Sequence, residues 1–327
     1  MIKHSVLVIT YNQKDYIRET LNSLIFQTEQ PYEIVIVDDR SDDGNWEIIL
    51  EYQNLYPDLI RAFRNEINLG VFGNASKVKS LFTGNVASLC SGDDFLEPDA
   101  IKSVNDKIRE EQLDADSEKF IIITNSVHLY PDGSRTVWDN YRERHIPAIK
   151  TRLRYGLSYR GVGLSRSLMN SVMTEKQYLE LNSEVGLNAD FFKGFEEIIH
   201  SDKLFYINKL GGVYRLDVGV TSVEKSHKKW IAHQAAYKAV RERYLNYFDK
   251  DDLLFIEFIL RGDNFKVQPT ISNWVKALYY YVRNLNNFSY NNPAVRNLHY
   301  LLPTSSINYL KFKLYPIYLR FRQKKEV

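Results

Sequence analysis

Short apolar runs alternate with amphipathic segments over the first hundred residues. Four runs are apolar and rich in β-branched residues, as is typical of strands buried on both faces: Ser5–Thr10, Tyr32–Asp39, Ile60–Asn65 and Asn85–Cys90. Three segments between them have the spacing of helices: Tyr16–Gln27, Ser41–Tyr56 with a Ser/Asp cap at its start, and Asn74–Gly84. This order of strands and helices predicts a parallel sheet with helices on both faces.

The pattern changes after Asp99. We expect a polar helix over 100–112, a strand over 119–130, a hairpin turn over 130–135 that makes the sheet mixed, a helix over 187–202, and a strand followed by a turn over 203–216. From Ser226 onward the chain has long helical patterns. The sequence therefore predicts an α/β domain over residues 1–224 and a mostly helical region over 225–327.

The composition narrows the class of protein. Hydrophobic residues make up 44% and charged residues 26% of the chain, as in soluble globular proteins. The net charge of +2 gives no overall field that favours nucleic acid, and the single cysteine, Cys90, excludes an internal disulfide and a cysteine-built metal site. The N-terminal apolar run is too short for a signal-peptide core, and no window approaches the ~20 apolar residues of a spanning helix. We therefore expect a reducing compartment and no nucleic-acid partner.

Two acidic pairs follow strand ends. Asp38 and Asp39 close the second strand, and Asp93 and Asp94 follow the fourth. In a parallel sheet these ends share one rim, where ligands bind. The hard oxygens of the later pair suit Mg²⁺ or Mn²⁺, which would hold substrate phosphate, although a solvated turn is the alternative. The earlier pair suits a ribose or base, with helix capping and solvation of the strand end as the alternative.

The loop after the first strand contains no glycine. Its sequence, "TYNQKDY", argues against both a dinucleotide-binding fingerprint and a P-loop. The phosphates of a bound nucleotide would therefore need a metal ion for neutralisation.

Two stretches together resemble the family 2 glycosyltransferases. They are "SVLVITYNQKDYIRETLNSLIFQTEQPYEIVIVDDRSDDG" and "NLGVFGNASKVKSLFTGNVASLCSGDDFLEPDA". The resemblance covers about residues 4–103 and, more loosely, 160–222. It implies a GT-A fold, with residues 1–103 as the nucleotide-sugar-binding half and 104–224 as the acceptor-binding half.

The resemblance also implies a set of donor-binding residues at the strand ends: Thr10, Tyr11, Asn12, Asp38, Asp39 and Asp93. Within this set, Asp39 would contact the base, with Asp38 beside it. Asp94, the last acid of the family's DXD-type motif, is the implied ligand of the metal, Mg²⁺ or Mn²⁺.

The first half departs from the family pattern in two places. Ser91 stands where the fuller motif has its first acid, so fewer protein carboxylates would hold the metal. Ala75 and Ser76 stand where the family often has an Arg-Asn pair. Asn74 or Lys77 is then the candidate for the phosphate contacts.

The second half is expected to supply the catalytic base and further donor contacts. Asp190 is the candidate base, with Glu196 and Glu197 as rivals and an ordinary helix N-terminal residue as the alternative. Asp217 replaces the family's histidine and would either bind the metal or lie outside its shell. Arg215 would pair either with the diphosphate or with a nearby acid.

Together these features predict an inverting glycosyltransferase. The enzyme would move a sugar from a nucleotide-diphosphate donor, with UDP-sugars favoured, to a hydroxyl of a glycan or lipid-linked saccharide in surface polysaccharide synthesis. Asp190 would take the proton from the attacking hydroxyl. One alternative is a sugar-nucleotide or glycan binding protein without turnover. Another is a nucleotidyltransferase, which would usually need a glycine-rich, basic phosphate loop.

The C-terminal segment 309–325 interleaves basic residues with aromatic and aliphatic ones. This composition suits an anionic membrane surface, and a helix that packs on the domain is the alternative. Basic and aromatic residues also occur at nucleic-acid sites, but nothing else in the sequence supports one. We therefore expect a cytoplasmic protein held peripherally at the inner face of the cell membrane.

Overall fold

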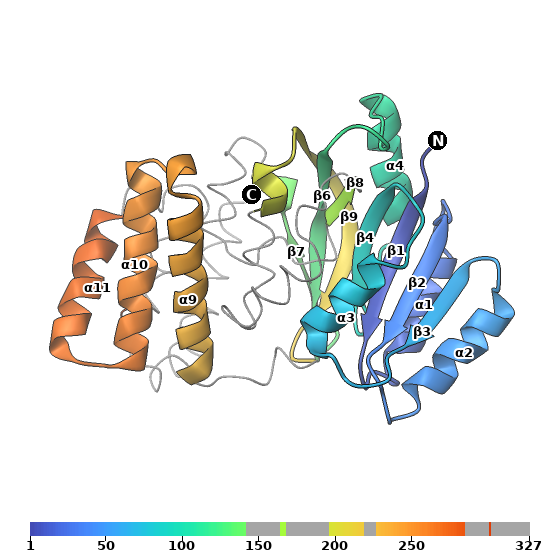
Figure 1. Cartoon of the computed structure of the whole chain (residues 1–327), viewed down its shortest axis with the longest axis horizontal. Coiled ribbons are helices and arrows are strands. Elements are labelled where there is room, and N and C mark those ends of the chain that lie inside the picture. Colours follow the sequence, from blue (N-terminus) through green and yellow to red (C-terminus); the bar gives the residue numbers. More distant parts are fainter. Residues whose placement is uncertain (142–163, 168–195, 219–226, 285–300, 302–327) are drawn as a thin grey trace. The chain divides into compact units, whose positions relative to one another are not determined.

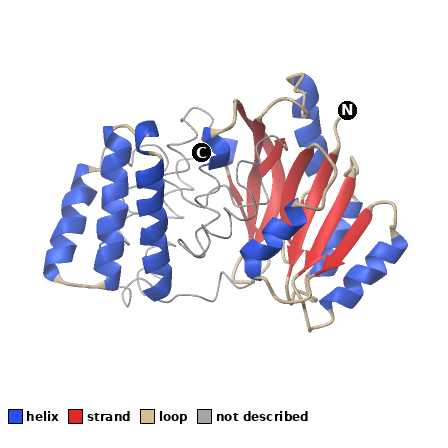
Figure 2. Cartoon of the chain, in the orientation of Figure 1, coloured by secondary structure: helices blue, strands red, loops and turns tan. Residues whose placement is uncertain are grey.

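The computed structural model describes residues 1–141, 164–167, 196–218, 227–284 and 301. The chain divides into two compact units, Met1–Glu224 and Lys225–Val327. Figures 1 and 2 show a sheet flanked by helices in the first unit and a set of helices in the second.

The described strands of the first unit form one mixed sheet with the order β3-β2-β1-β4-β8-β6-β9-β5, and β7 pairs with β6. The strands are β1 (His4–Thr10), β2 (Glu33–Asp38), β3 (Ile60–Arg64), β4 (Val86–Ser91), β5 (Phe95–Leu96), β6 (Phe120–Leu129), β7 (Arg135–Trp138), β8 (Leu164–Ser167) and β9 (Lys203–Arg215). The first four run parallel, and β8 pairs antiparallel with both β4 and β6. This arrangement confirms the predicted mixed α/β sheet.

Helices cover both faces of the parallel part, as the strand pattern predicts. The helices of this unit are α1 (Ile17–Ile25), α2 (Asn45–Leu55), α3 (Gly70–Lys79) and α4 (Ala100–Glu110). Side chains of β1 alternate between the faces: Val6 and Val8 pack in the cluster that holds α1 and α2, whereas Leu7 packs in the cluster that holds Val78 of α3. Because both faces are covered, the middle of β1 is continuously apolar.

One edge of the sheet collects the carboxyl ends of the parallel strands, β1, β2, β4 and β9 among them. Strand β1 pairs with β2 on one side and with β4 on the other, and it runs parallel to both. Strand β8 pairs antiparallel with both β4 and β6, so β6 runs in the same direction as β4. Strand β9 pairs parallel with β6 and therefore shares that direction. The short strand β5 pairs Phe95 with Val213 near the end of β9. The end of β9 therefore lies beside the turn that follows β4.

Three local predictions were wrong. Helix α3 ends at Lys79, five residues before Gly84. A Cβ on Gly84 would lie 2.3 Å from the Lys3 carbonyl oxygen, so this glycine serves the close approach of two chain segments. The N-cap of α2 is Gly44, with a φ of 97° and no side-chain cap. Where a strand and then a turn were predicted over 203–216, the structure has the single strand β9. This strand stays paired with β6 along its length, with a shift in register.

The second unit contains α9 (His227–Arg243), a 3-10 turn (Leu245–Tyr247), α10 (Lys250–Val267) and α11 (Ile271–Arg283) among its described residues. Helix α10 packs against both α9 and α11. The start of α10 has a capping box in which the carboxylates of Asp249 and Asp252 accept from backbone N–H groups. In the described part of the chain, no helix has both the length and the apolar character needed to cross a membrane.

Candidate active site

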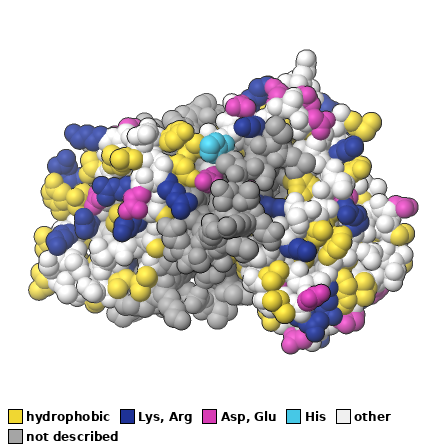
Figure 3. Space-filling model, viewed as in Figure 1, with side chains coloured by type: hydrophobic (Ala, Val, Ile, Leu, Met, Phe, Trp, Pro, Cys, Tyr) yellow, Lys and Arg dark blue, Asp and Glu magenta, His cyan; other side chains and the backbone are white. Residues whose placement is uncertain are grey.

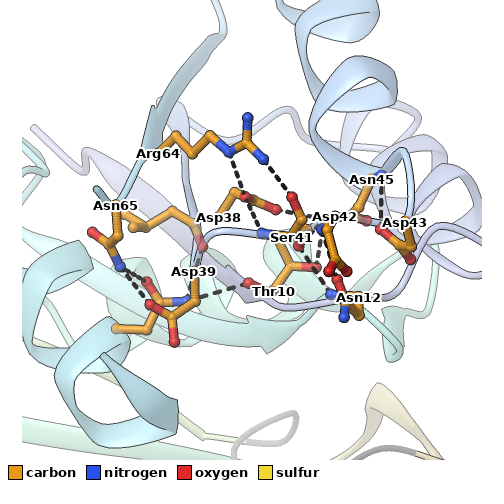
Figure 4. Close-up of polar contacts among 12 residues, drawn as sticks. Thr10, Asn12, Asp38, Asp39, Ser41, Asp42, Asp43, Asn45, Arg64 and Asn65 are labelled. Atoms are coloured by element: carbon orange, nitrogen blue, oxygen red, sulfur yellow. Dashed lines mark hydrogen bonds and ion pairs between the residues drawn. The ribbon is translucent and has the colours of Figure 1, made fainter. Parts of the chain in front are cut away.

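Asp38 anchors the loop that follows β2. Its side chain is fully buried, and Oδ1 accepts from the Ser41 backbone N–H at 2.9 Å while Oδ2 accepts from the Asn45 amide at 2.9 Å. The guanidinium of Arg64 lies 3.4 Å from Oδ1 and donates to the Ser41 carbonyl oxygen. Figure 4 shows these contacts converging on the loop. Asp38 therefore holds the loop in shape.

Asp39 directs one of its oxygens away from the protein framework. Oδ1 accepts from the Asn65 amide and from the Leu69 backbone N–H, both at 2.8 Å. Among the described residues no donor reaches Oδ2, and in Figure 4 no contact is drawn to it. The Asp39 backbone N–H donates to the Thr10 carbonyl oxygen at 2.9 Å, which fixes the residue against β1. Oδ2 is thus an acceptor held at the rim.

Hydrogen bonds join the loop after β1 to the loop after β2. The Asn12 backbone N–H donates to the Ser41 hydroxyl at 2.9 Å, and the Asn12 side-chain oxygen accepts from the Asp42 backbone N–H at 3.0 Å. Asn12 and Arg40 both have left-handed backbones, with φ of 50° and 67°. Tyr11, which precedes Asn12, is exposed, whereas Asp39 is 2% exposed. The hydrogen bonds thus join the two loops at the rim where β1 and β2 end.

The turn after β4 fits closely against the end of β1. A Cβ on Gly92 would lie 2.5 Å from the Thr10 hydroxyl oxygen, so only glycine fits without displacement. The Gly92 backbone N–H donates to the Ile9 carbonyl oxygen at 2.9 Å, and the Thr20 hydroxyl lies within hydrogen-bonding distance of the Gly92 and Asp94 carbonyl oxygens. The acidic pair is therefore fixed on the same rim as the loops after β1 and β2.

The two carboxylates of this turn are held in a nearly dry setting. Asp93 is 9% exposed and Asp94 is 3% exposed. Burial raises the pKa of the Asp93 carboxyl, against the opposing effects of its backbone N–H, the Gln13 amide and the Arg215 charge. Burial and the two neighbouring acids also raise the pKa of the Cys90 thiol. Because both side chains are buried, two charged carboxylates cost free energy here unless a cation lies beside them.

Arg215, at the end of β9, braces the acidic turn. Its backbone N–H donates to Asp94 Oδ1 at 2.9 Å, and its Nε donates to the Asp93 carbonyl oxygen at 2.9 Å. The guanidinium pairs with Glu19 at 2.7 Å and lies over the rings of Tyr16 and Phe95. Arg215 thus pairs with a nearby acid, and its contact with a diphosphate stays a prediction.

Comparison with known proteins identifies the family. The family model described as "Glycosyl transferase family 2" matches residues 5–172, just over half of the chain. The chain belongs to glycosyl transferase family 2.

Relatives and solved structures agree with this assignment. Glycosyltransferase GlyA of Streptococcus pneumoniae is 25% identical over 255 residues, which is 74% of this chain and 34% of GlyA. The poly(ribitol-phosphate) beta-N-acetylglucosaminyltransferase TarS of Staphylococcus aureus is 32% identical over 117 residues, 35% of this chain and 20% of TarS. The matches thus span about a third or less of these curated relatives.

The crystal structure of S. aureus TarS 1-349 in complex with UDP-GlcNAc has the same fold. It superposes with a TM-score of 0.57 at 16% sequence identity, covering 94% of this chain and 92% of that one. This family 2 chain therefore has the predicted GT-A fold.

Other sequence-predicted residues lie elsewhere or outside the described residues. Asn74 is buried and donates to the Val37 carbonyl oxygen at 3.0 Å, so it joins the framework. Lys77 is exposed in the last turn of α3. Asp217 is exposed with a φ of 59°, just past the end of β9. Asp190 lies outside the described residues, as does the segment 309–325.

The two rival bases are close together in the chain, and the acidic turn has few acidic neighbours among the described residues. Glu196 and Glu197 lie in a described helical turn, where Glu197 is 5% exposed. In the described ranges, no group of three histidine, cysteine or acidic side chains converges as a metal site. Any ion at Asp93 and Asp94 would thus have one or two protein carboxylates among its described ligands.

Sequence reasoning missed several residues that shape this glycosyltransferase site. Asn65 orients Asp39, Asn45 and Arg64 hold Asp38, and Gln13 supports Asp93. Asn65 is the last residue of a predicted strand, and this position at a strand end was an available signal. The contacts of the others depend on side-chain directions in three dimensions, which spacing along the sequence does not give.

Proposed function

We propose that this chain is an inverting glycosyltransferase that takes its sugar from a nucleotide-diphosphate donor, with UDP-sugars favoured. The observation that carries the proposal is the convergence of the Asp39 acceptor and the Asp93–Asp94 turn on one rim of a GT-A sheet. The acceptor would be a hydroxyl of a glycan or lipid-linked saccharide in surface polysaccharide synthesis. This class is supported by the complex of TarS with UDP-GlcNAc, and by two relatives, TarS among them, that are named as poly(ribitol-phosphate) glycosyltransferases.

Recognition of the base would fall to Asp39. A carboxylate only accepts hydrogen bonds, so Oδ2 suits a base that presents a ring N–H, as uracil does. Tyr11 is exposed beside it and offers a flat surface, and Thr10 and Asn12 fix the backbone there. Asp38 would act indirectly by holding the loop, because its oxygens are engaged within the protein.

The acidic turn fits a divalent cation. The donor set consists of hard carboxylate oxygens, and the raised pKa of Asp93 marks a site where a cation relieves the cost of two buried charges. Asp94, with Asp93 beside it, would hold Mg²⁺ or Mn²⁺, and Asp217 stays a prediction as a further ligand. When bound, the ion would neutralise the diphosphate leaving group.

Proton removal from the acceptor is assigned to Asp190. The position rests on the family resemblance and on its place in the acceptor-binding half, 104–224. As the base, its carboxylate would accept the proton of the acceptor hydroxyl as that oxygen attacks the anomeric carbon. Contact of segment 309–325 with the inner face of the cell membrane would bring the enzyme to lipid-linked acceptors.

A donor screen tests this function. UDP-, GDP- and thymidine-diphosphate sugars would be incubated with the full chain in Mg²⁺ or Mn²⁺, and nucleotide release would be measured with and without saccharide acceptors. We expect release from a UDP-sugar, lost with chelator. Binding of a donor with no release under any of these conditions would favour a binding protein without turnover.

A further inference from the structure

Helix α11 carries an apolar stripe on its outward face. Ile271 is 84% exposed, and Val275, Tyr279 and Val282 are 52–54% exposed. Their spacing of four, four and three residues places them along one side of the helix. A contiguous exposed stripe of this kind marks an interaction surface more often than scattered exposed residues do.

The stripe lies beside the face of α11 that packs within its own unit. That face is made by Ala277, Leu278 and Tyr281, which pack in a cluster with Phe265 and Leu301. Tyr281 also packs against Phe258 of α10, at 5.9 Å between ring centroids. Leu278 is adjacent to Ile271 around the helix, so the stripe continues the packed face outward to the surface.

The charges beside the stripe have one sign. Lys276 and Arg283 are exposed, and α11 contains no acidic residue. The Arg283 guanidinium lies 5.8 Å from the centre of the Tyr279 ring, so cation and aromatic share one surface. In Figure 3, yellow hydrophobic and dark-blue basic side chains lie together on the part of the second unit that contains α11.

We propose that α11 lies on an anionic lipid surface, with this stripe in the boundary between headgroups and acyl chains. Interfacial helices combine an apolar face, aromatic residues and flanking lysine or arginine, and they bind through apolar area together with attraction to anionic lipid. A second copy of the chain fits less well. Two such helices would bring Lys276 and Arg283 of each copy together with no acid on either helix to pair them. The residues of this surface belong neither to segment 309–325 nor to the residues proposed to bind the donor.

Vesicle flotation tests the proposal with the full chain. Phosphatidylcholine vesicles with and without phosphatidylglycerol would be mixed with wild type and with the double variant Ile271→Gln, Val275→Gln. Glutamine is a good helix former, so the variant removes apolar area without opposing the helix. We expect wild type to float with the anionic vesicles and the variant to bind roughly tenfold more weakly. The variant Lys276→Gln, Arg283→Gln should reduce the preference for anionic vesicles.

The matched control is Phe26→Gln, Leu55→Gln, which removes exposed apolar side chains from the first unit (68% and 65% exposed). It should float as wild type does, and circular dichroism should show equal helix content in all four proteins. No flotation of wild type, or equal flotation of wild type and the α11 variant, would overturn the proposal. A loss of oligomers in sedimentation by the α11 variant, with flotation unchanged, would assign the stripe to a second copy instead.

Discussion

At the scale of single residues, the orientation of Asp39 decides what the rim can recognise. Asn65 and the Leu69 backbone N–H both donate to Oδ1, which leaves Oδ2 as the oxygen that we propose contacts the base. An acceptor there attracts the ring N–H of uracil and repels the corresponding ring nitrogen of cytosine, which has no hydrogen. Base selectivity should therefore depend on a residue that does not touch the base.

The first prediction concerns this orientation. In Asn65→Ala, Asp39 keeps one of its two donors to Oδ1 and turns more freely, so the preference for UDP over CDP should narrow about tenfold. Calorimetric titration of both nucleotides with each protein measures the ratio of affinities. Asn68→Ala, an exposed asparagine of the same loop, is the control. An unchanged ratio in Asn65→Ala would show that Asn65 does not set the selectivity.

The second prediction concerns the catalytic base. Asp190→Asn should lower turnover by about 10²–10⁴-fold, because the amide cannot take the acceptor's proton, while donor affinity stays unchanged. Single-turnover kinetics with donor and acceptor, beside donor titration, separate these two quantities. Glu196→Gln tests the rival in the same assay. Near-full activity of Asp190→Asn would remove Asp190 from this role.

At the scale of elements, a buried histidine ties β1 to its neighbours. The His4 ring nitrogens lie 2.8 Å from the Asn105 side-chain oxygen of α4 and 2.8 Å from the Ser88 hydroxyl of β4. Burial lowers the pKa of His4 to about 4, against the opposing effects of the Asn105 hydrogen bond and the Glu29 charge. The folded protein therefore keeps this ring neutral.

The third prediction follows from this shift. Between pH 6.5 and about 4 the unfolded state binds a proton at His4 that the folded state does not. The free energy of unfolding should thus fall as pH falls through this window, by about 3 kcal/mol in total from this group. Denaturant unfolding of wild type, His4→Gln and the exposed control His200→Gln over this range measures it. The decrease in the free energy of unfolding should be smaller in His4→Gln than in wild type and His200→Gln. An equal dependence of this free energy on pH in all three proteins would refute the assignment.

Much of the parallel sheet could be predicted because its strands are buried on both faces. The runs at Ser5–Thr10 and Asn85–Cys90 match β1 and β4 to within one residue, since continuous apolar sequence leaves little freedom of placement. The end of α3 and the continuity of β9 were missed. Gly84 has a packing role that looks like a helix stop in sequence, and the glycines of β9 lie within a strand whose register against β6 shifts.

The site was predictable in part for a related reason. Acids at strand ends are visible in the sequence, and topology alone brings them to one rim. What each acid does depends on its partners: Asp38 has a donor on each oxygen and the charge of Arg64 beside it, whereas Asp39 has both of its donors on one oxygen. Two aspartates in adjacent positions thus take different roles, and a rule based on spacing along the sequence could not distinguish these roles.

At the scale of the whole molecule, our proposals assign a different task to each unit. The first unit carries the rim that we propose binds the donor, and its family membership and GT-A fold follow from comparison. The second unit offers a helix whose exposed side suits a lipid surface. A transferase that acts on lipid-linked acceptors would gain from holding its rim near the membrane, because attachment raises the local concentration of acceptor.

The central claim is that the Asp93–Asp94 turn binds a nucleotide diphosphate through a divalent cation. Calorimetric titration of UDP into wild type, Asp94→Asn and the exposed control Asp42→Asn, each with Mn²⁺ and with chelator, tests it most directly. We predict that chelation weakens UDP binding at least tenfold in wild type and in Asp42→Asn, and that Asp94→Asn has the weak affinity in both conditions. UDP affinity that neither chelator nor Asp94→Asn alters would contradict the account.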